Sequence, residues 1–326
     1  MSNRLAESRS PIRFGCRSCA FTLVELLVVI SIIALLISIL LPSLRGAREA
    51  AKAAVCLSHL RSLSHGWHMY ADDHNDVCLP GRYAKAPGGT ANPANWYDVG
   101  NGMKYPPRWV ATMGKYVGIY AFNQPQTDTD RQAYDSEVYQ CPKVPEWINE
   151  RNYAYGYNHQ FLGNARRTNS QFHNFPVNRS RIRAFAGTVL GADCMGTAAG
   201  VARTARQPYD PGGGDFNQLG NHGWTLDPPR LTAASDKGTG DITPGGRGSP
   251  MAGPDPRHRN RLNAVFCDGH AESITPQRLG YRYQENGALL DTSLAGNPTP
   301  DDPAGLPTNE NFSGSGRADD PPALPG

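Results

Sequence analysis

The chain has 326 residues, of which 39% are hydrophobic and 19% charged, and its formal net charge is +3. This length is enough for one membrane helix and one soluble domain with a substantial core. Four arginines and one glutamate in residues 1–20 account for the whole net charge, so the rest of the chain is nearly neutral. We therefore expect no nucleic-acid partner, because such partners are bound through basic surfaces.

Residues 21–41 read FTLVELLVVISIIALLISILL, with Glu25 as the only charged side chain. A helix of about 20 apolar residues spans a bilayer core, so this segment is long enough to cross a membrane. A secretory signal peptide has an apolar region of only about 7–15 residues followed by a small-residue cleavage site, which is absent after this run. The basic residues that precede the span predict a cytoplasmic N-terminus by the positive-inside rule.

Glu25 is unusual because an acidic side chain inside a membrane span costs about 2.5–3.5 kcal/mol and usually has a partner. One interpretation is that Glu25 lies near the membrane interface and stays hydrated. The other is that the carboxylate meets a cation at the same depth. A chain cut between Ala20 and Phe21 would supply such a cation as the new amino terminus of a neighbouring subunit.

The basic leader, the small residue Ala20 and the sequence FTLVELLVVISIIALL resemble the prepilin-type cleavage and methylation segment of type IV pilins and type II secretion pseudopilins. The resemblance implies that a prepilin peptidase removes residues 1–20 and methylates the new amine of Phe21. It also implies that Glu25 pairs with the N-terminus of a neighbouring subunit during assembly. The family usually has glycine before the cut. Ala20 is the smallest departure from glycine, and we expect cleavage to occur.

The helix is predicted to continue beyond the membrane over residues 42–72, with a kink at Pro42. Apolar residues recur there at steps of three and four, at Ala47, Ala50, Ala54, Leu57, Leu60, Leu63, Trp67 and Tyr70. This spacing predicts an amphipathic helix with one apolar stripe. The polar cluster DDHND indicates that it ends near Ala71.

Residues 73–295 are predicted to form a globular head. RWVATMGKYVG indicates a short helix, and NYAYGYNHQFL and AGTVLGADC indicate strands. Residues 196–256 are rich in Gly, Pro and Asp and are interpreted as a loop insertion, while residues 296–326 lack the apolar content to fold and are predicted to be a disordered tail. The predicted fold is α+β and pilin-like, with a long N-terminal helix packed on an antiparallel β-sheet head with long loops.

A second motif lies near the C-terminus. LNAVFCDGHAESI predicts two short strands joined by a tight turn at Asp268-Gly269, because glycine accepts a positive φ. His258 stands ten residues before Asp268, and His270 follows the turn. This H-x9-DG arrangement over residues 258–275 resembles the processing-associated domain of a large bacterial pseudopilin-like family. The segments YGYN and TVLGAD resemble the intermediate strands of that domain.

Three interpretations of His258, Asp268 and His270 are open. Two imidazoles and a carboxylate suit zinc or a similar ion, with Asp193 as a further ligand if its strand neighbours the hairpin. In the structural interpretation, which we favour, Asp268 caps the turn and His258 hydrogen-bonds the hairpin backbone. A catalytic role is the third.

Calcium is a further candidate ligand. The side chains of Asp72, Asp73, Asn75 and Asp76 could coordinate it through oxygen atoms, but this cluster lacks the glycine and the distal glutamate of an EF-hand loop. A solvated helix end is the favoured interpretation. Alternate tyrosines at Tyr153, Tyr155 and Tyr157 could form a sugar-stacking platform or pack in a core.

Five of the seven cysteines follow the membrane segment, at Cys56, Cys78, Cys141, Cys194 and Cys267. In an oxidising compartment an odd number leaves at least one unpaired. The sequence does not define the pairing, and a bond between Cys56 and Cys141 is one hypothesis. Cys16 and Cys19 form a CxxC in the leader without a second Cys or His pair to complete a zinc site.

The leading functional hypothesis is a non-enzymatic subunit of a type II secretion or type IV pilus-like filament, with no cofactor. Its expected partners are prepilin peptidase, identical or related subunits, and the bacterial inner membrane. The leader would be cytoplasmic and the head periplasmic or extracellular. The alternative is a membrane-tethered module that binds polysaccharide or envelope material. A tethered hydrolase finds little support, because the sequence has no HExxH or G-x-S-x-G motif.

Overall fold

The computed structural model describes residues 22–125, 132–144, 153–163, 166–168, 171–173, 177–200, 202–206, 223–230, 252–289 and 307–319. The predicted leader, which includes Ala20 and the CxxC motif, and the adjoining Phe21 lie outside the described residues. The chain divides into two compact units, Met1–Arg48 and Glu49–Gly326.

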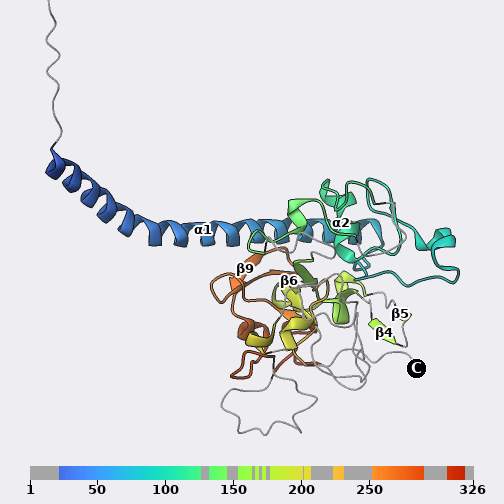
Figure 1. Ribbon diagram of the computed structural model, residues 1–326. Coiled ribbons are helices and arrows are strands. Elements are labelled where there is room, and N and C mark those ends of the chain that lie inside the picture. Colours follow the sequence, from blue (N-terminus) through green and yellow to red (C-terminus); the bar gives the residue numbers. More distant parts are fainter. Residues whose placement is uncertain are drawn as a thin grey trace, which may run out of the picture. The chain divides into compact units, whose positions relative to one another are not determined.

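The longest element is helix α1, which runs over Leu23–Asp73, 51 residues (Figure 1). Pro42 lies inside α1 and does not end it, although proline removes one backbone hydrogen bond. The helix ends where the chain turns back, with Asn75 at φ 54° and Asp76 at φ 66°, and the Asp76 amide donates to the Ala71 carbonyl at 2.8 Å. Left-handed residues that follow the last turn are a common way to end a helix.

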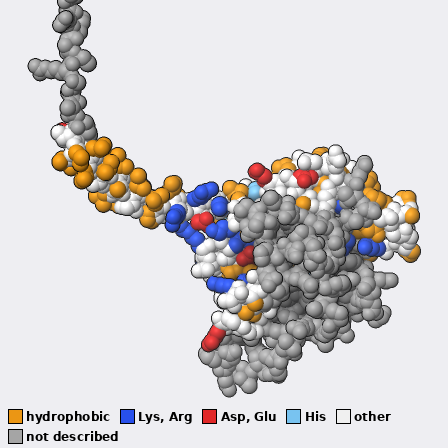
Figure 2. Space-filling view, in the orientation of Figure 1, with side chains coloured by type: hydrophobic (Ala, Val, Ile, Leu, Met, Phe, Trp, Pro, Cys, Tyr) orange, Lys and Arg blue, Asp and Glu red, His pale blue; other side chains and the backbone are white. Residues whose placement is uncertain are grey.

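In the first unit, every described residue from Thr22 to Arg45 is exposed. Figure 2 shows this stretch covered by hydrophobic side chains. A soluble surface rarely carries so large a contiguous apolar area. Among the described residues, α1 is the one helix long and apolar enough to cross a membrane, and it is compatible with a single-pass anchor.

The second unit is built on a five-stranded antiparallel sheet with the order β3-β6-β8-β9, in which β7 also pairs with β6. The strands are β3 Tyr155–Tyr157, β6 Val189–Gly196, β7 Gly253–Pro254, β8 Leu262–Phe266 and β9 Ala271–Ile274. Around it lie α2 Trp109–Val117 and two small hairpins, β1 Tyr97–Asp98 with β2 Met103–Lys104 and β4 Arg166–Thr168 with β5 Gln171–His173. This architecture confirms the predicted α+β class and fits a pilin-like fold.

The C-terminal half of α1 packs on this sheet. Its contacts reach several strands: the Trp67 indole donates to the Tyr157 hydroxyl at 2.9 Å, and the Arg61 guanidinium donates to the Ala271 carbonyl at 3.0 Å. Its buried side chains are Cys56, Leu60, Leu63, Ser64, Gly66, Trp67, Tyr70 and Ala71. The predicted stripe is therefore right from Leu60 onward.

The prediction that the alanines of this stripe are buried is wrong. Ala47, Ala50 and Ala54 are exposed, and Cys56 begins the buried face instead. Alanine favours the helix itself and is compatible with either environment, so its spacing carries little information about burial.

The sheet separates two hydrophobic clusters. On β6, Leu190 belongs to the cluster that includes the buried face of α1, whereas Val189 and Ala192 belong to the other. Tyr153, Tyr155 and Tyr157 are all buried in the first cluster. These tyrosines therefore form core, which rules them out as an exposed platform for sugars.

The predicted hairpin is formed by β8 and β9, with Asn263 opposite Ser273. Gly269 has φ 90°, and the Asp268 carboxylate accepts a hydrogen bond from the His270 amide at 3.1 Å. The Asp-Gly pair thus closes the turn as its chemistry suggests, since aspartate oxygens bond to the backbone two residues on.

The predicted tail requires a correction, because residues 307–319 pack against the head. Phe312 is fully buried and makes an edge-on contact with Tyr281 at a centroid distance of 5.8 Å. The Asn158 side chain donates to the Phe312 carbonyl at 3.0 Å, and the Val189 amide donates to the Asn311 carbonyl at 2.8 Å. One aromatic residue and a few backbone bonds can dock a segment of polar composition onto a preformed surface.

Part of the predicted 196–256 insertion also belongs to the core. Trp224 and Leu226 are buried, and the Leu226 amide donates to the Tyr157 carbonyl at 2.8 Å. Its stretches 207–222 and 231–251 lie outside the described residues. A single surface loop is therefore too simple a description of this segment.

We predict that Phe312→Ala lowers the free energy of unfolding of the head by about 3–5 kcal/mol, the usual cost of truncating a buried phenylalanine. Urea denaturation of the detergent-solubilised full chain, followed by tryptophan fluorescence, measures the change. Met69→Ala is the control, since Met69 is 49% exposed and its loss should change stability by less than about 0.5 kcal/mol. Equal effects of both substitutions would contradict the docked position of residues 307–319.

Candidate functional site

Among the described residues, two places bring together candidate functional groups, and the first is the N-terminus of α1. The Glu25 carboxylate accepts hydrogen bonds from the backbone N–H and the hydroxyl of Thr22, both at 2.8 Å. The Thr22 hydroxyl in turn accepts a bond from the Glu25 amide at 3.2 Å. This reciprocal arrangement is a capping box, in which a threonine and a glutamate three residues later satisfy the free amides of a helix start.

The capping box was missed in the sequence, although the spacing T-x-x-E at Thr22–Glu25 is its signature. Glu25 therefore has a role within its own chain that the sequence reading did not include. The carboxylate is nevertheless exposed, so a second partner can reach it. Capping also holds the carboxylate beside the start of the helix.

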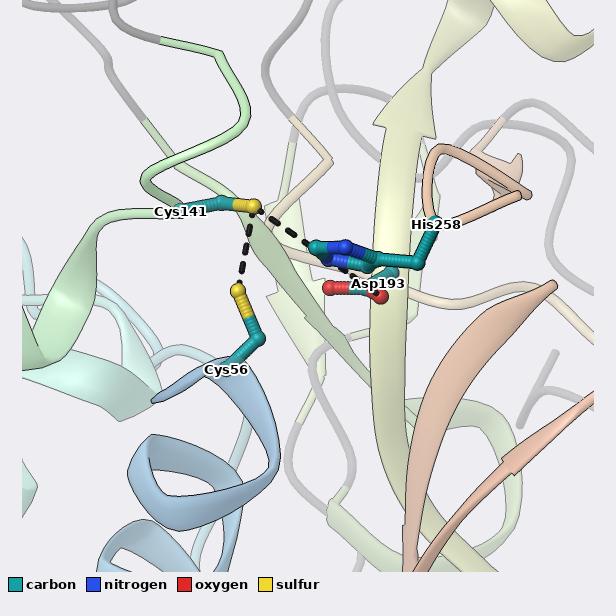
Figure 3. Close-up of side chains that lie close together, drawn as sticks. All are labelled: Cys56, Cys141, Asp193 and His258. Atoms are coloured by element: carbon teal, nitrogen blue, oxygen red, sulfur yellow. Dashed lines mark hydrogen bonds and ion pairs between the residues drawn. The ribbon is translucent and has the colours of Figure 1, made fainter. Parts of the chain in front are cut away.

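The second place is a buried cluster of Cys56, Cys141, Asp193 and His258 (Figure 3). The four side chains come from four separate segments: α1, the loop after residues 137–139, strand β6, and the loop between β7 and β8. One potential ligand atom from each residue lies within 4.8 Å of the others. The topology thus gathers two thiols, a carboxylate and an imidazole at one point between α1 and the sheet.

The contacts inside the cluster are close. The two sulfur atoms are 3.1 Å apart, and the Cys141 sulfur is 3.5 Å from His258 Nε2. The same nitrogen lies 3.6 Å from Asp193 Oδ2, which is longer than a hydrogen bond. Both cysteines are free thiols. The hypothesis of a pair is therefore right about their proximity, but the structure contains no disulfide between Cys56 and Cys141.

The groups of the cluster shift one another's pKa values. Burial raises the pKa of the Asp193 carboxyl to about 7, against the opposing effect of the Arg257 charge. Burial by itself lowers the pKa of His258, but the contacts with Cys141 and Asp193 outweigh it and the net shift is upward. The pKa of Cys141 is lowered because the Cys56 thiol donates to its sulfur, and the same contact raises the pKa of Cys56.

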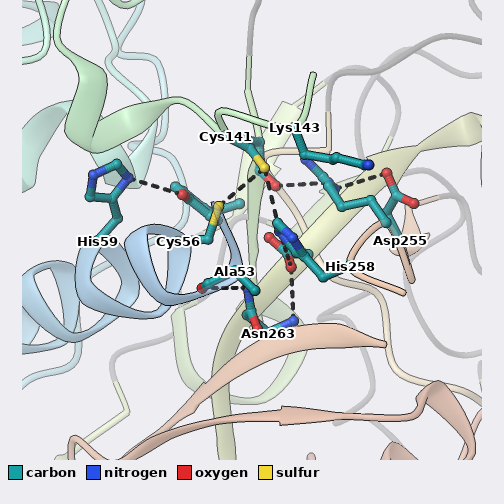
Figure 4. A network of polar contacts seen from close by, with 12 residues as sticks. Ala53, Cys56, His59, Cys141, Lys143, Asp255, His258 and Asn263 are labelled. Atoms are coloured by element: carbon teal, nitrogen blue, oxygen red, sulfur yellow. Dashed lines mark hydrogen bonds and ion pairs between the residues drawn. The ribbon is translucent and has the colours of Figure 1, made fainter. Parts of the chain in front are cut away.

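A shell of hydrogen bonds holds the cluster in place (Figure 4). The Asn263 backbone N–H donates to Asp193 Oδ2 at 2.8 Å, and the Asn263 side chain donates to the Ala53 carbonyl of α1 at 3.2 Å. Lys143, two residues after Cys141, forms an ion pair with Glu49 of α1. These bonds connect α1 to the Cys141 loop and to β8.

The structure separates the three residues that the H-x9-DG motif suggested as one metal site. His258 lies beside Asp193, which was the suggested further ligand. Asp268 and His270 instead contact each other at 2.5 Å in the exposed turn, beyond the far end of β8. Asp268 follows Asn263 by five positions, or about 16 Å along an extended chain.

The favoured interpretation, that the His258 side chain hydrogen-bonds the hairpin backbone, is wrong. This side chain contacts Cys141 and Asp193, whereas the local bonds with Arg261 are made by the His258 backbone. Sequence reasoning missed both cysteines as neighbours of His258. The one available signal was the pairing hypothesis for Cys56 and Cys141, which brings the two sulfurs together.

The suggested calcium cluster is engaged by a cation of the chain itself. Arg179 contacts the Asp72 carboxylate at 2.6 Å and the Asp76 carboxylate at 2.9 Å. The Ser180 amide donates to Asp76 at 2.8 Å. These contacts are those of a helix end tied to a neighbouring loop.

Comparison with known proteins identifies the N-terminal segment. Residues 16–41 match the prokaryotic N-terminal methylation motif. This match includes Ala20, Phe21 and Glu25. Neither the curated proteins nor the solved structures give a significant match to the chain.

We predict that Asp76→Asn destabilises the head at neutral pH and that the difference from the wild type narrows on acidification. The bond from the Ser180 amide lowers the pKa of Asp76 below its ordinary 3.8. Its stabilisation is thus present above about pH 4 and is lost as the pH falls through the lower folded-state pKa. Thermal unfolding midpoints of both proteins between pH 7 and pH 3 measure this. If the two unfolding midpoints differ by the same amount at every pH, the ionised Asp76 carboxylate does not supply this stabilisation.

Proposed function

We propose that this chain is a non-enzymatic, pilin-like subunit that prepilin peptidase cuts between Ala20 and Phe21, and that assembles into a type II secretion or type IV pilus-like filament. The observation that carries the proposal is the methylation motif at residues 16–41, which runs directly into the exposed apolar start of α1. By the positive-inside rule, the four arginines of residues 1–20 support a cytoplasmic leader and a head in the periplasm or outside the cell.

The exposed apolar surface of α1 supports two successive environments for the helix, first the membrane and then a bundle of helices from other subunits. In the bacterial inner membrane, lipid covers the side chains of Leu23 to Leu41. When a subunit leaves the membrane, the same surface must be covered again, and helices of identical or related subunits are the available cover. A filament with a helical core meets this demand, because it buries a large apolar area on every subunit.

Glu25 fits the proposal as the partner of a neighbour's methylated Phe21 amine. Opposite charges inside an apolar bundle interact strongly, and each would be costly to bury alone. The Thr22 cap supports this role, because it holds the carboxylate beside the helix start, where a staggered neighbour presents its own N-terminus. In the alternative, a tethered binding module, the chain would stay solitary, and the buried tyrosines offer it no platform.

We predict that the mature protein begins at Phe21 and that its amino group is methylated. Mass spectrometry of the intact N-terminus, in cells with and without prepilin peptidase, measures both changes. Ala20→Gly should be cut at least as fast as the wild type, while a bulky residue at position 20 should leave the leader attached. A mature wild-type chain that still carries residues 1–20 would refute the proposal.

We predict that Glu25→Gln leaves the precursor inserted and cut but removes it from filaments. Glutamine can still serve in a capping box, so this change removes the charge and keeps the cap. Thr22→Val is the matched control, because it removes the cap, at a cost of about 1 kcal/mol, and keeps the charge. Immunogold labelling of sheared filaments measures incorporation.

The two substitutions separate the two roles of Glu25. If the intersubunit ion pair drives assembly, Thr22→Val filaments form and Glu25→Gln filaments do not. Normal incorporation of Glu25→Gln would show that the carboxylate serves only its own helix.

A further inference from the structure

We propose that Cys56, Cys141, Asp193 and His258 form a tetrahedral zinc site that joins α1 to the sheet of the head. The proposal is independent of filament assembly, since it concerns the second unit of the chain alone. It differs from the metal site suggested by the H-x9-DG motif, of which it keeps only His258 and the suggested further ligand Asp193.

The donor set matches zinc by chemistry. Zinc binds thiolate sulfur, imidazole nitrogen and carboxylate oxygen, and structural sites have four protein ligands. Calcium and magnesium prefer all-oxygen sites, so two thiols argue against them. Because all four ligands would come from the protein, the site has no open position for a substrate, and its role is structural.

Two distances fit one shared ion, and all pairs of potential ligand atoms lie within 4.8 Å. With zinc–sulfur bonds of about 2.3 Å and zinc–nitrogen bonds of about 2.0–2.1 Å, tetrahedral ligand atoms lie about 3.3–3.8 Å apart. Cys141 Sγ to His258 Nε2 is 3.5 Å, and His258 Nε2 to Asp193 Oδ2 is 3.6 Å. The sulfur atoms, 3.1 Å apart, need to separate by about 0.6 Å. A disulfide requires them to approach by about 1 Å.

An unsatisfied buried carboxylate oxygen favours the ion over a disulfide. Within the described part of the chain, Asp193 Oδ1 has no hydrogen-bond partner, and the Asp193 side chain is fully buried. In Figure 3 the carboxylate of Asp193 extends under the imidazole toward the two sulfur atoms. A disulfide would add no partner for this carboxylate, whereas a bound zinc ion contacts it directly.

The surroundings suit the charge of a loaded site. Zinc with two thiolates and one carboxylate has a net charge of −1, and the two thiol protons leave when the ion binds. Arg257 lies close enough to interact with both Asp193 and Cys141, and its side chain is only 4% exposed. The Asn263 N–H orients Asp193 from behind, as outer-shell groups do for metal ligands.

The test uses the full chain in detergent, purified under reducing conditions, stripped with a chelator and titrated with Zn²⁺ or Co²⁺. We expect one ion per chain. Co²⁺ should give a thiolate-to-metal charge-transfer band, because two sulfur ligands are present. We also expect Zn²⁺ to raise the thermal unfolding midpoint, because the ion binds the folded chain.

Matched variants locate the ion. Cys141→Ala should lower the Zn²⁺ affinity at least about 100-fold, given that even outer-shell changes cost about 10–100-fold. Cys78→Ala is the control, since Cys78 is a buried thiol with the same 3% exposure as Cys141 but outside the cluster. It should leave the affinity and the Co²⁺ band unchanged.

Two results would overturn the proposal, and neither depends on a variant that folds. The first is a reduced wild-type chain that binds no Zn²⁺ or Co²⁺ at micromolar concentrations. The second is a Co²⁺ complex of the wild type without a thiolate band. If the first result is obtained and the chain isolated without reductant contains a Cys56–Cys141 disulfide, the cluster is a disulfide site.

Discussion

The structure depends on one continuous helix that must satisfy two environments. The hydrogen bonds of α1 are internal, so its first half can lie in lipid, where an open backbone could not. Its side chains from Leu23 to Leu41 are exposed and, apart from Glu25, Ser31 and Ser38, apolar, which is compatible with lipid or other helices around them. From Cys56 onward the same helix supplies one wall of the head's core. Helix α1 thus contributes residues to both units of the chain.

Several polar groups along this helix make defined contacts. Glu25 caps the helix start through Thr22 and remains open to a further partner. Glu49 pairs with Lys143 of the head, and Asn263 donates to the Ala53 carbonyl. The proposed metal site would strengthen the same junction, because Cys56 lies on α1 and the other three ligands lie on the head.

The candidate site illustrates why proximity is harder to infer than local structure. Cys56, Cys141, Asp193 and His258 are separated by 85, 52 and 65 residues along the chain, and no short motif contains two of them. Their meeting depends on the antiparallel pairing of β3, β6 and β8 and on the docking of α1 across these strands. Asp268 and His270, which stand close to His258 in the sequence, are carried away from it by the length of β8.

The sequence by itself determined the elements whose signals are local. The apolar run predicted the membrane-length helix, the steps of three and four predicted its buried face from Leu60, and the Asp-Gly pair predicted the turn between β8 and β9. Only the tertiary structure decided that Cys56 meets His258, that Ala54 is exposed and that Phe312 docks a polar segment. Helix periodicity and turn geometry arise from neighbouring residues, whereas burial and side-chain encounters depend on surfaces brought together from distant parts of the chain.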